Sequence, residues 1–440
     1  MGRVHWVNHA GFAVRSDAGT TLVVDPWFSG DVFHGSWRLL SPTQTSIEDL
    51  ADCRHVWLSH EHPDHFSPAA LAAFPEAQRR EMTVWYQPTR DGRVLAHCAG
   101  LGYRVRETVP GTTMAIGPGI EARSGSVGFD SWLHLVVDGT SLLNVNDCEF
   151  VVLKELEQLA EDLGSVDVLF QQFSYANGFS NPDDPAHRRR QASDKIDRLT
   201  TAVGLFHPEA VVPCASFVWF NHEENEYLND SVITIERSAE HLAAIGVRPV
   251  VLYPGDDWVL GAPHDNGPAL AAYAADVERT RDQPRTRSVA VPDADLWEAS
   301  EASQVRLHEK NQLWLLAPFS RTRYLEPTVI RVTDSAQGLF RYDMFHGLSP
   351  ADPDTSEADV EMAGESLLFC LRHEFGVNTL MVNGRFRQCR PGGLLRFRLQ
   401  FSPNLRNNHG ESIPGVFLNR RFLTEEARKL LTIRWRALRA

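Results

Sequence analysis

Four residues of the types that commonly bind metal ions are clustered in the stretch HEHPDH: His60, His62, Asp64 and His65. Neutral imidazole and carboxylate groups suit zinc, iron and manganese. Pro63 restricts the backbone and disfavours helix at the residue before it, so these side chains should project from a turn and could converge on one point. The alternative is a solvent-exposed, histidine-rich loop. The number and spacing of the four residues favour a metal site.

The elements on either side place this cluster on a strand-to-helix loop. The apolar run from Val56 to Leu58 predicts a short buried strand before the cluster. After it, Ser67 is a typical N-cap residue and Pro68 is suited to the first helical position.

The HEHPDH stretch matches the H-x-H-x-D-H signature of the metallo-β-lactamase fold, which residues 1 to about 260 resemble. The upstream stretch VHWVNHAGFAVRSDAGTTLVVDPWFSG is similar to the opening of that fold. The resemblance implies an α/β protein with an αββα sandwich. It also implies that Asp25 supports the metal-binding loop without binding the metal directly.

The same resemblance implies two further ligands. Asp147 ends the apolar stretch LLNVND, where this fold has a carboxylate that can bridge two metals, and His222 follows the stretch FVWFN, in the place of the last histidine ligand. Taken alone, the first would be an ordinary turn aspartate and the second a loop histidine. The implied set gives one position His60, His62 and Asp147, and the other Asp64, His65, Asp147 and His222. Asp64 and Asp147 are also the candidate catalytic carboxylates.

One histidine of the family pattern is absent. The fold usually supplies a third histidine to the first metal from the region that here reads EARSGSVGFDSW, where Ser124 and Ser126 stand instead. A single metal at the second position is one expectation. The other expectation is a site for two metals in which a carboxylate such as Glu149 or Glu223 completes the ligand set.

Several stretches indicate which group within this family the chain resembles. DPWFSGDVFHGSWRLLSP, FSYANGFSNP, LYPGDDW and FGVNTLMVNGRF are together similar to the catalytic region of CMP-N-acetylneuraminate hydroxylase and its bacterial relatives. That resemblance implies an iron-dependent monooxygenase supplied with electrons by a Rieske cluster. Such a cluster needs C-x-H and C-x-x-H, and here Cys53-Arg54-His55 meets the first spacing, whereas the second occurs only far downstream, at Cys370-Leu371-Arg372-His373. We therefore expect no Rieske domain in this chain, and electrons that come either from a separate protein or from a diiron site cycling with an external reductase.

Two classes of function follow from these residues. The first is a non-heme iron oxygenase or hydroxylase with one or two iron ions, acting on a small or carrier-linked substrate. The alternative is a zinc-dependent hydrolase of an ester, lactone, thioester or phosphodiester, which would use a metal-bound hydroxide. Trp37, Tyr175 and Trp219 flank the predicted site and are candidates for substrate binding, although aromatic residues are equally typical of a protein core.

The length of 440 residues predicts two domains. The net charge of the chain is −14. We expect a catalytic domain over residues 1–277, a polar linker over 278–288, and a small accessory α+β domain over 289–440 that ends in a helix near TEEARKLL. From Arg372 onward the sequence has 14 basic and 4 acidic residues, against 29 and 53 before it. Nucleic-acid binding is not expected, and the C-terminal domain with its basic segment is expected either to cover the site or to mediate self-association. No apolar run is long enough for a membrane span, so we expect a cytoplasmic protein.

Overall fold

The computed structural model describes residues 1–150, 153–175, 180–319 and 325–415. The chain divides into two compact units, one of Met1–Asn177 with Asp183–Thr286 and the other of Gly178–Pro182 with Arg287–Ala440. The main division follows Thr286, inside the predicted linker of residues 278–288, and helix α7 (Gly267–Arg281) extends into the start of that segment. The domain limits of 1–277 and 289–440 stay predictions until the two parts are separated experimentally.

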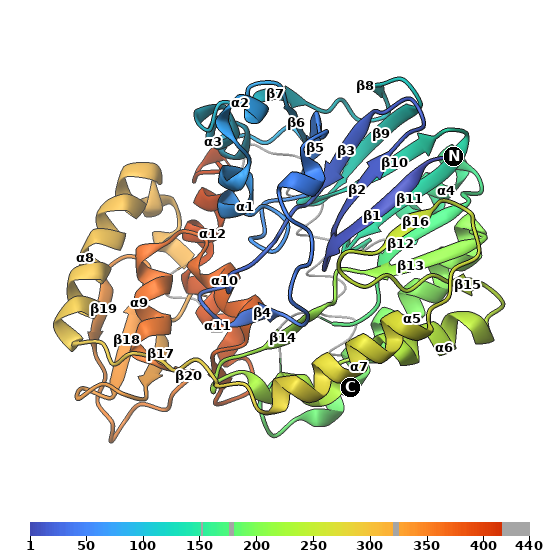
Figure 1. Ribbon diagram of the computed structural model, residues 1–440. Coiled ribbons are helices and arrows are strands. Elements are labelled where there is room, and N and C mark those ends of the chain that lie inside the picture. Colours follow the sequence, from blue (N-terminus) through green and yellow to red (C-terminus); the bar gives the residue numbers. More distant parts are fainter. Residues whose placement is uncertain (151–152, 176–179, 320–324, 416–440) are drawn as a thin grey trace. The chain divides into compact units, whose positions relative to one another are not determined.

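The first unit contains two large sheets (Figure 1). The strands of the first sheet are β1 (Arg3–Asn8), β2 (Gly11–Arg15), β3 (Thr21–Val24), β5 (His55–Trp57), β6 (Thr83–Tyr86), β7 (Arg104–Glu107) and β16 (Asp257–Val259). Their order is β16-β1-β2-β3-β5-β6-β7. Strands β16, β1, β2 and β3 pair antiparallel, whereas β3, β5, β6 and β7 pair parallel. The parallel part directs the carboxyl ends of β3 and β5 to the same edge.

The second sheet is also mixed. Its strands are β8 (Thr113–Gly117), β9 (Ile120–Val127), β10 (Asp130–Val137), β11 (Thr140–Asn146), β12 (Val168–Gln172), β13 (Ala210–Cys214) and β15 (Arg248–Pro249), in the order β15-β13-β12-β11-β10-β9-β8. Strands β10 and β11 form a hairpin that turns at Asp138-Gly139. Asp138 and Gly139 both have positive φ, of 48° and 88°, as a two-residue type I′ turn requires.

Helices cover the outer faces of these sheets (Figure 1). The helices are α1 (Pro68–Ala73), α2 (Glu76–Arg79) and α3 (Arg93–Gly100) beside the first sheet, and α4 (Leu153–Leu163), α5 (Pro185–Phe206) and α6 (Ile235–Ala244) beside the second. Between the sheets, Phe12 of β2 stacks on Phe170 of β12 with ring centroids 4.5 Å apart. Outside the first sheet, Leu71 of α1 and Cys98 of α3 share a buried cluster with Val56 of β5. The first unit is therefore the expected αββα sandwich.

Two short strands connect loops of this unit. Strand β4 (Trp37–Leu39) pairs antiparallel with β14 (Val218–Phe220), with Trp37 opposite Phe220. The 3-10 helices η1 (Glu48–Leu50) and η2 (Glu226–Ser231) belong to neighbouring loops. Because His222 follows β14 by two residues, this pairing ties the His222 loop to the segment around residue 37.

The second unit is a smaller α+β domain, as expected. Its strands are β17 (Thr328–Val332), β18 (Leu339–Asp343), β19 (Gly347–Pro350), β20 (Val360–Met362) and β21 (Arg387–Gln388), in the order β19-β18-β17-β20-β21. Its helices are α8 (Asp293–Lys310), α9 (Gly364–Arg372), α10 (Gly376–Asn383), α11 (Gly393–Gln400), α12 (Ser402–Asn408), η3 (Leu313–Leu315) and η4 (Ala317–Phe319). The predicted helix near TEEARKLL lies outside the described residues.

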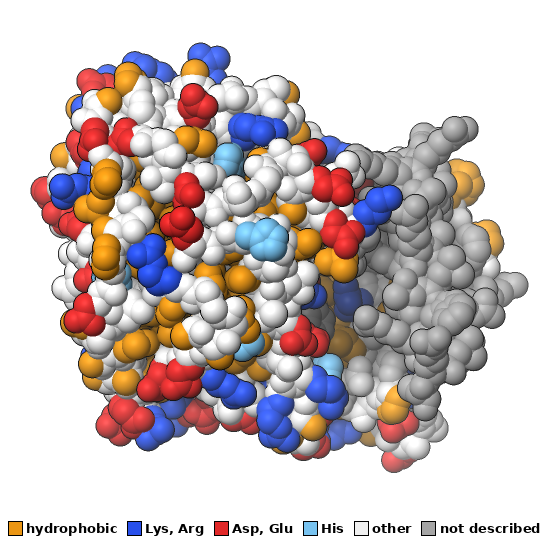
Figure 2. All heavy atoms as spheres, turned by 90° about the vertical axis from the view of Figure 1, so that its right-hand side faces the viewer, with side chains coloured by type: hydrophobic (Ala, Val, Ile, Leu, Met, Phe, Trp, Pro, Cys, Tyr) orange, Lys and Arg blue, Asp and Glu red, His pale blue; other side chains and the backbone are white. Residues whose placement is uncertain are grey.

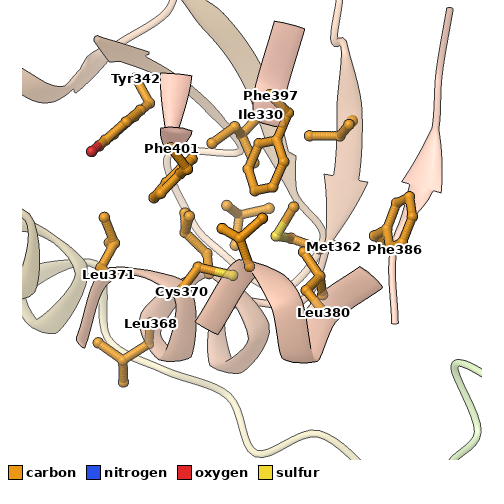
Figure 3. Packing of buried hydrophobic residues seen from close by; sticks show 14 of the residues in the cluster. Ile330, Tyr342, Met362, Leu368, Cys370, Leu371, Leu380, Phe386, Phe397 and Phe401 are labelled. Carbon is orange, nitrogen blue, oxygen red and sulfur yellow. The ribbon is translucent and has the colours of Figure 1, made fainter. Parts of the chain in front are cut away.

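A continuous apolar core holds this second unit together (Figure 3). Ile330 of β17 and Tyr342 of β18 face Phe397 and Phe401, which come from the segment of α11 and α12. The Tyr342 and Phe401 rings stack with centroids 4.2 Å apart. Burial of these large side chains is the main stabilising contribution.

Over the residues that the structure describes, no helix has the length and apolar character needed to cross a membrane. On the face drawn in Figure 2, acidic and basic side chains are interspersed, with apolar side chains exposed between them.

Candidate metal centre

The predicted metal ligands lie where strands of both sheets end. The HEHPDH loop follows β5, and Asp147 follows β11. Asp25 follows β3, the parallel neighbour of β5. Helix α1 begins after the loop as predicted, because Ser67 caps it by accepting a hydrogen bond from Ala70 N at 3.2 Å. The loop is thus anchored by a strand on one side and a capped helix on the other.

A first group of possible ligands consists of His60, His62 and Asp147. His60 Nε2 lies 2.9 Å from His62 Nδ1 and 3.7 Å from Asp147 Oδ2. One ligand atom of each residue lies within 4.8 Å of the others. Two ring nitrogens and a carboxylate oxygen this close together can bind one metal ion.

A second group lies beside it. His65 Nε2 is 3.6 Å from Asp64 Oδ2 and 3.7 Å from Asp147 Oδ2. His9 Nε2 approaches Asp64 Oδ2 at 3.3 Å, so that His9, Asp64 and His65 form a buried cluster of possible ligands. Since Asp147 Oδ2 faces both groups, its carboxylate is placed where it could bridge two ions.

Asp25 holds the loop from behind, at the place that the resemblance implies. Its Oδ1 accepts a hydrogen bond from Ser59 N at 2.8 Å. Its Oδ2 accepts hydrogen bonds from Ser59 Oγ at 2.6 Å, His65 Nδ1 at 2.9 Å and Asn146 Nδ2 at 2.8 Å. Asp25 is fully buried, and this single carboxylate therefore ties the HEHPDH loop to the end of β11.

These hydrogen bonds also decide which imidazole nitrogens face the cluster. Ser59 Oγ donates to Asp25, so it accepts from Nδ1 of His60 at 3.0 Å. His65 donates from Nδ1 to Asp25. Both imidazoles consequently direct Nε2 toward Asp147, as metal-binding histidines do when their other ring nitrogen is held by a partner.

The charges of the cluster shift its pKa values. Burial by itself would lower the pKa of His65, but Asp147, Asp64 and Asp25 outweigh it and raise that pKa to about 10. Burial would raise the pKa of Asp64, but the charge of His65 and the hydrogen bond from His9 lower it. The pKa of His60 is lowered, chiefly by burial. A carboxylate environment that stabilises a proton on His65 would equally stabilise a cation in its place.

Unsatisfied polar atoms give an independent test of fit. Asp64 Oδ1, His65 Nε2 and Asp147 Oδ1 are buried, and among the described residues they have no hydrogen-bond partner. Leaving such atoms unpaired costs about 1–3 kcal/mol each. Because these atoms belong to both groups, the residues present fit metal ions at this place.

Ser124 and Ser126 lie on β9, on the face that is shared with Leu133 and Ser131 of β10. Ser126 is exposed and pairs with Ser131, whose hydroxyl donates to Ser59 O immediately before His60. Ser124 is buried one pair further along, opposite Leu133. Of the two serines, Ser126 is nearer to the HEHPDH loop.

Two residues near the cluster were missed by the sequence reasoning. His9 is the first, and its signal was a histidine directly after an apolar strand. Asp130 is the second: its Oδ1 lies 3.8 Å from His60 Nδ1, and burial together with Asp147 raises its pKa. Asp130 begins β10 and Asp147 directly follows β11, so the hairpin joined at Asp138-Gly139 brings both carboxylates to the same end. The alternative carboxylate Glu149 is exposed and accepts a hydrogen bond from Lys195 at 3.2 Å.

The remaining predicted residues are buried. His222 lies in the loop after β14, where its Nδ1 accepts a hydrogen bond from Glu224 N at 3.1 Å, and its role as a ligand stays a prediction. Trp37, Tyr175 and Trp219 are at most 4% exposed. The guanidinium groups of Arg38 and Arg285 lie over the Trp219 ring, 5.7 and 5.0 Å from its centroid. Such burial is typical of packing residues, and substrate binding by the three aromatics stays a prediction.

Comparison with known proteins agrees with this fold. Residues 3–170 match the Beta-lactamase superfamily domain. The first unit therefore has a metallo-β-lactamase-like fold, and the chain also contains a smaller C-terminal domain.

The relatives with similar sequences include proteins named for two different kinds of chemistry. A protein of Mycolicibacterium smegmatis named as a Rieske 2Fe-2S iron-sulfur protein is 28% identical over 242 residues, which is 51% of this chain and 45% of that protein. A UPF0173 metal-dependent hydrolase of Cereibacter sphaeroides is 29% identical over 111 residues, which is 24% of this chain and 42% of that protein. The chain thus spans about half the length of the curated relatives it matches.

Comparison with solved structures gives partial matches at lower identity. CmlA, a diiron beta-hydroxylase from Streptomyces venezuelae, has 18% identity and a TM-score of 0.41, covering 59% of this chain and 54% of its own. Zn(2+)-bound PqqB from Methylobacterium extorquens has 14% identity and a TM-score of 0.37, covering 59% of this chain and 100% of its own. At these scores neither structure bears on the reaction.

Proposed function

We propose that this protein is a non-heme iron oxygenase or hydroxylase that binds one or two iron ions and acts on a small or carrier-linked substrate. The observation that carries the proposal is the composition of the first position. It has two histidines and the carboxylate of Asp147, with serine where the fold usually has a third histidine. Two histidines with carboxylate oxygen ligands are typical of iron sites that react with O₂.

In this proposal His60, His62 and Asp147 hold the first ion, and Asp64, His65, Asp147 and His222 hold the second. Bound iron supplies the one-electron chemistry that activation of O₂ requires. Asp25 and Ser59 keep the Nε2 atoms of His60 and His65 directed at Asp147. The fixed carboxylate and imidazole geometry lets the site bind an ion without reorganising the loop.

Redox chemistry of this kind needs an electron donor. The relative named as a Rieske iron-sulfur protein matches 51% of this chain, more than the 24% matched by the hydrolase relative, and supports an oxidative reaction. We propose that a separate protein or an external reductase supplies the electrons.

The experiment is anaerobic loading with Fe(II), followed by exposure to ¹⁸O₂ with a reductant and candidate substrates. The proposal expects stoichiometric iron, O₂ consumption that depends on substrate, and ¹⁸O in the product. A zinc-loaded protein that turns over the same substrate with oxygen only from H₂¹⁸O would contradict it.

A metal-dependent hydrolase is the second candidate. It is favoured by the UPF0173 hydrolase relative, at 29% identity over 111 residues. In that case Asp64 or Asp147 would orient the attacking water and accept its proton, while a zinc ion would supply Lewis acidity. Metal analysis of protein purified without added metal separates the two candidates, since iron with near-ultraviolet absorbance supports the first and colourless zinc protein the second.

A further inference from the structure

His9 belongs to the cluster but has no role in the ligand set above. It follows β1, is 1% exposed, and places its Nε2 3.3 Å from Asp64 Oδ2. Its ring contacts those of His65 and Trp27, with centroids 5.8 and 5.6 Å away. Asp64 is therefore in contact with a buried histidine from outside the HEHPDH loop.

The backbone at His9 is held in an unusual conformation. Its φ is 50°, in the left-handed region that residues other than glycine rarely adopt. Neighbouring groups fix it there: Ala215 N donates to His9 O at 2.8 Å, and His9 N donates to Asn8 Oδ1 at 2.9 Å. Conformations of this kind cost free energy and persist only where the surroundings impose them, which is common at functional sites. Asp25 and Asn146, both in the hydrogen-bond network of the cluster, share it with φ of 39° and 49°.

Two roles are open to His9. As a ligand through Nε2, it would carry its hydrogen on Nδ1, which is buried and has no hydrogen-bond partner among the described residues. As a donor through Nε2 to Asp64, His9 would carry no hydrogen on Nδ1. The group left without a partner would then be an acceptor lone pair and not an N–H. Buried N–H groups without a partner are rarer than buried acceptors without one. The donor role is therefore the less costly.

The atoms of Asp64 agree with the donor role. Its Oδ2 faces His9, whereas its Oδ1 is buried without a hydrogen-bond partner in the described part of the chain. A carboxylate held by one oxygen can present the other to an ion in a fixed direction.

We propose that His9 is a positioning residue of the second metal position: its Nε2–H donates to Asp64 Oδ2 and directs Asp64 Oδ1 at the ion. This inference rests on the proposed metal site. His9 thus acts on the ion indirectly, through Asp64. The four proposed ligands of this position, Asp64, His65, Asp147 and His222, act directly.

The decisive experiment compares His9→Gln with His9→Leu in the full-length protein. Glutamine keeps a donor near the place of Nε2 and is a poor ligand, whereas leucine has similar bulk and no donor. Zinc and Co(II) affinities are measured by chelator competition, and the Co(II) spectrum reports the coordination of each equivalent. His134, which lies on β10 with its Nε2 2.9 Å from Ser141 Oγ, gives the control pair His134→Gln and His134→Leu.

We expect His9→Leu to lower the affinity for the second metal equivalent by about 10- to 100-fold. His9→Gln should stay within a few-fold of wild type, with the first equivalent and both His134 variants unchanged. Equal loss in both His9 variants would make His9 a ligand, and no loss in either would leave it without a role; each result overturns the inference.

A measurement on the wild-type protein covers the case in which His9→Leu does not fold. Side-chain ¹⁵N NMR of the zinc-loaded protein should show His9 protonated at Nε2, and a metal-bound Nε2 would overturn the inference. Wild-type protein that binds no zinc, Co(II) or Fe(II) would instead overturn the proposed function, and would do so before any variant is compared.

Discussion

Asp147 Oδ2 lies 3.7 Å from Nε2 of His65. The same oxygen lies 3.7 Å from Nε2 of His60, so one carboxylate oxygen faces an imidazole from each of the two possible metal positions. Asp147 is thus the residue whose loss should affect both positions together.

Asp147→Asn should reduce the bound metal to less than one ion per chain, because an amide is a much weaker ligand than a carboxylate at both positions. Asp64→Asn should remove the second ion only. Metal content after dialysis against a weak chelator measures both. Asp52→Asn is the control, since Asp52 pairs with Arg15 at the surface. Retention of two ions by Asp147→Asn would show that the bridging role is wrong.

Asp25→Asn should weaken metal binding by about 10- to 100-fold, because the imidazole of His65 loses the carboxylate that orients it. It should also cost about 1–3 kcal/mol of unfolding free energy in the metal-free protein, since buried donors lose their acceptor.

The matched control for Asp25 is Asp167→Asn. Asp167 Oδ2 accepts a hydrogen bond from Ser141 N at 2.7 Å, at the other end of β11. This variant should lose stability and keep its metal affinity. Equal losses of affinity in the two variants would mean that Asp25 acts only through general stability.

Ser126→His should raise zinc affinity at the first position and lower any O₂-dependent activity, because it restores the imidazole that the fold usually supplies. Chelator competition and O₂ consumption measure the two effects. Arg123→His on the same strand is the control, since residue 123 lies on the opposite face of β9. If both variants bind zinc alike, residue 126 is not the place of the absent histidine.

Asp130→Asn should weaken retention of the first ion by about tenfold, whereas Glu149→Gln should have no effect. The reason is position: Asp130 Oδ1 lies 3.8 Å from His60 Nδ1, whereas Glu149 is exposed and paired with Lys195. Iron stoichiometry at limiting Fe(II) separates the two carboxylates. The reverse ranking would make Glu149 the carboxylate that completes the first position.

Phe397→Ala should destabilise the second unit by about 3–5 kcal/mol, because this fully buried ring lies in the core of that unit. The metal content of the first unit should be unchanged at temperatures below the unfolding temperature of the first unit. Leu395→Ala is the control, as Leu395 is 54% exposed and its loss should cost less than about 0.5 kcal/mol. Loss of metal in parallel with unfolding of the second unit would argue against two separate domains.

The sequence determined the local features of this site. HEHPDH, the Ser67-Pro68 helix start and the Asp138-Gly139 turn each depend on a few neighbouring residues, whose backbone preferences and hydrogen bonds act over short distances. Because the turn fixes the register of β10 and β11, the position of Asp130 at the start of β10, at the same end of the hairpin as Asp147 after β11, also follows from local information.

Only the tertiary structure decided how these segments meet. His9 and Asp64 are 55 residues apart, and Asp25 and Asn146 are 121 apart, yet each pair is hydrogen-bonded. Contacts of this kind depend on strand order and on how two sheets pack, which no local pattern specifies. Burial of Trp37, Tyr175 and Trp219 was likewise decided by packing, because an aromatic side chain in a loop is equally suited to a core or to a binding surface.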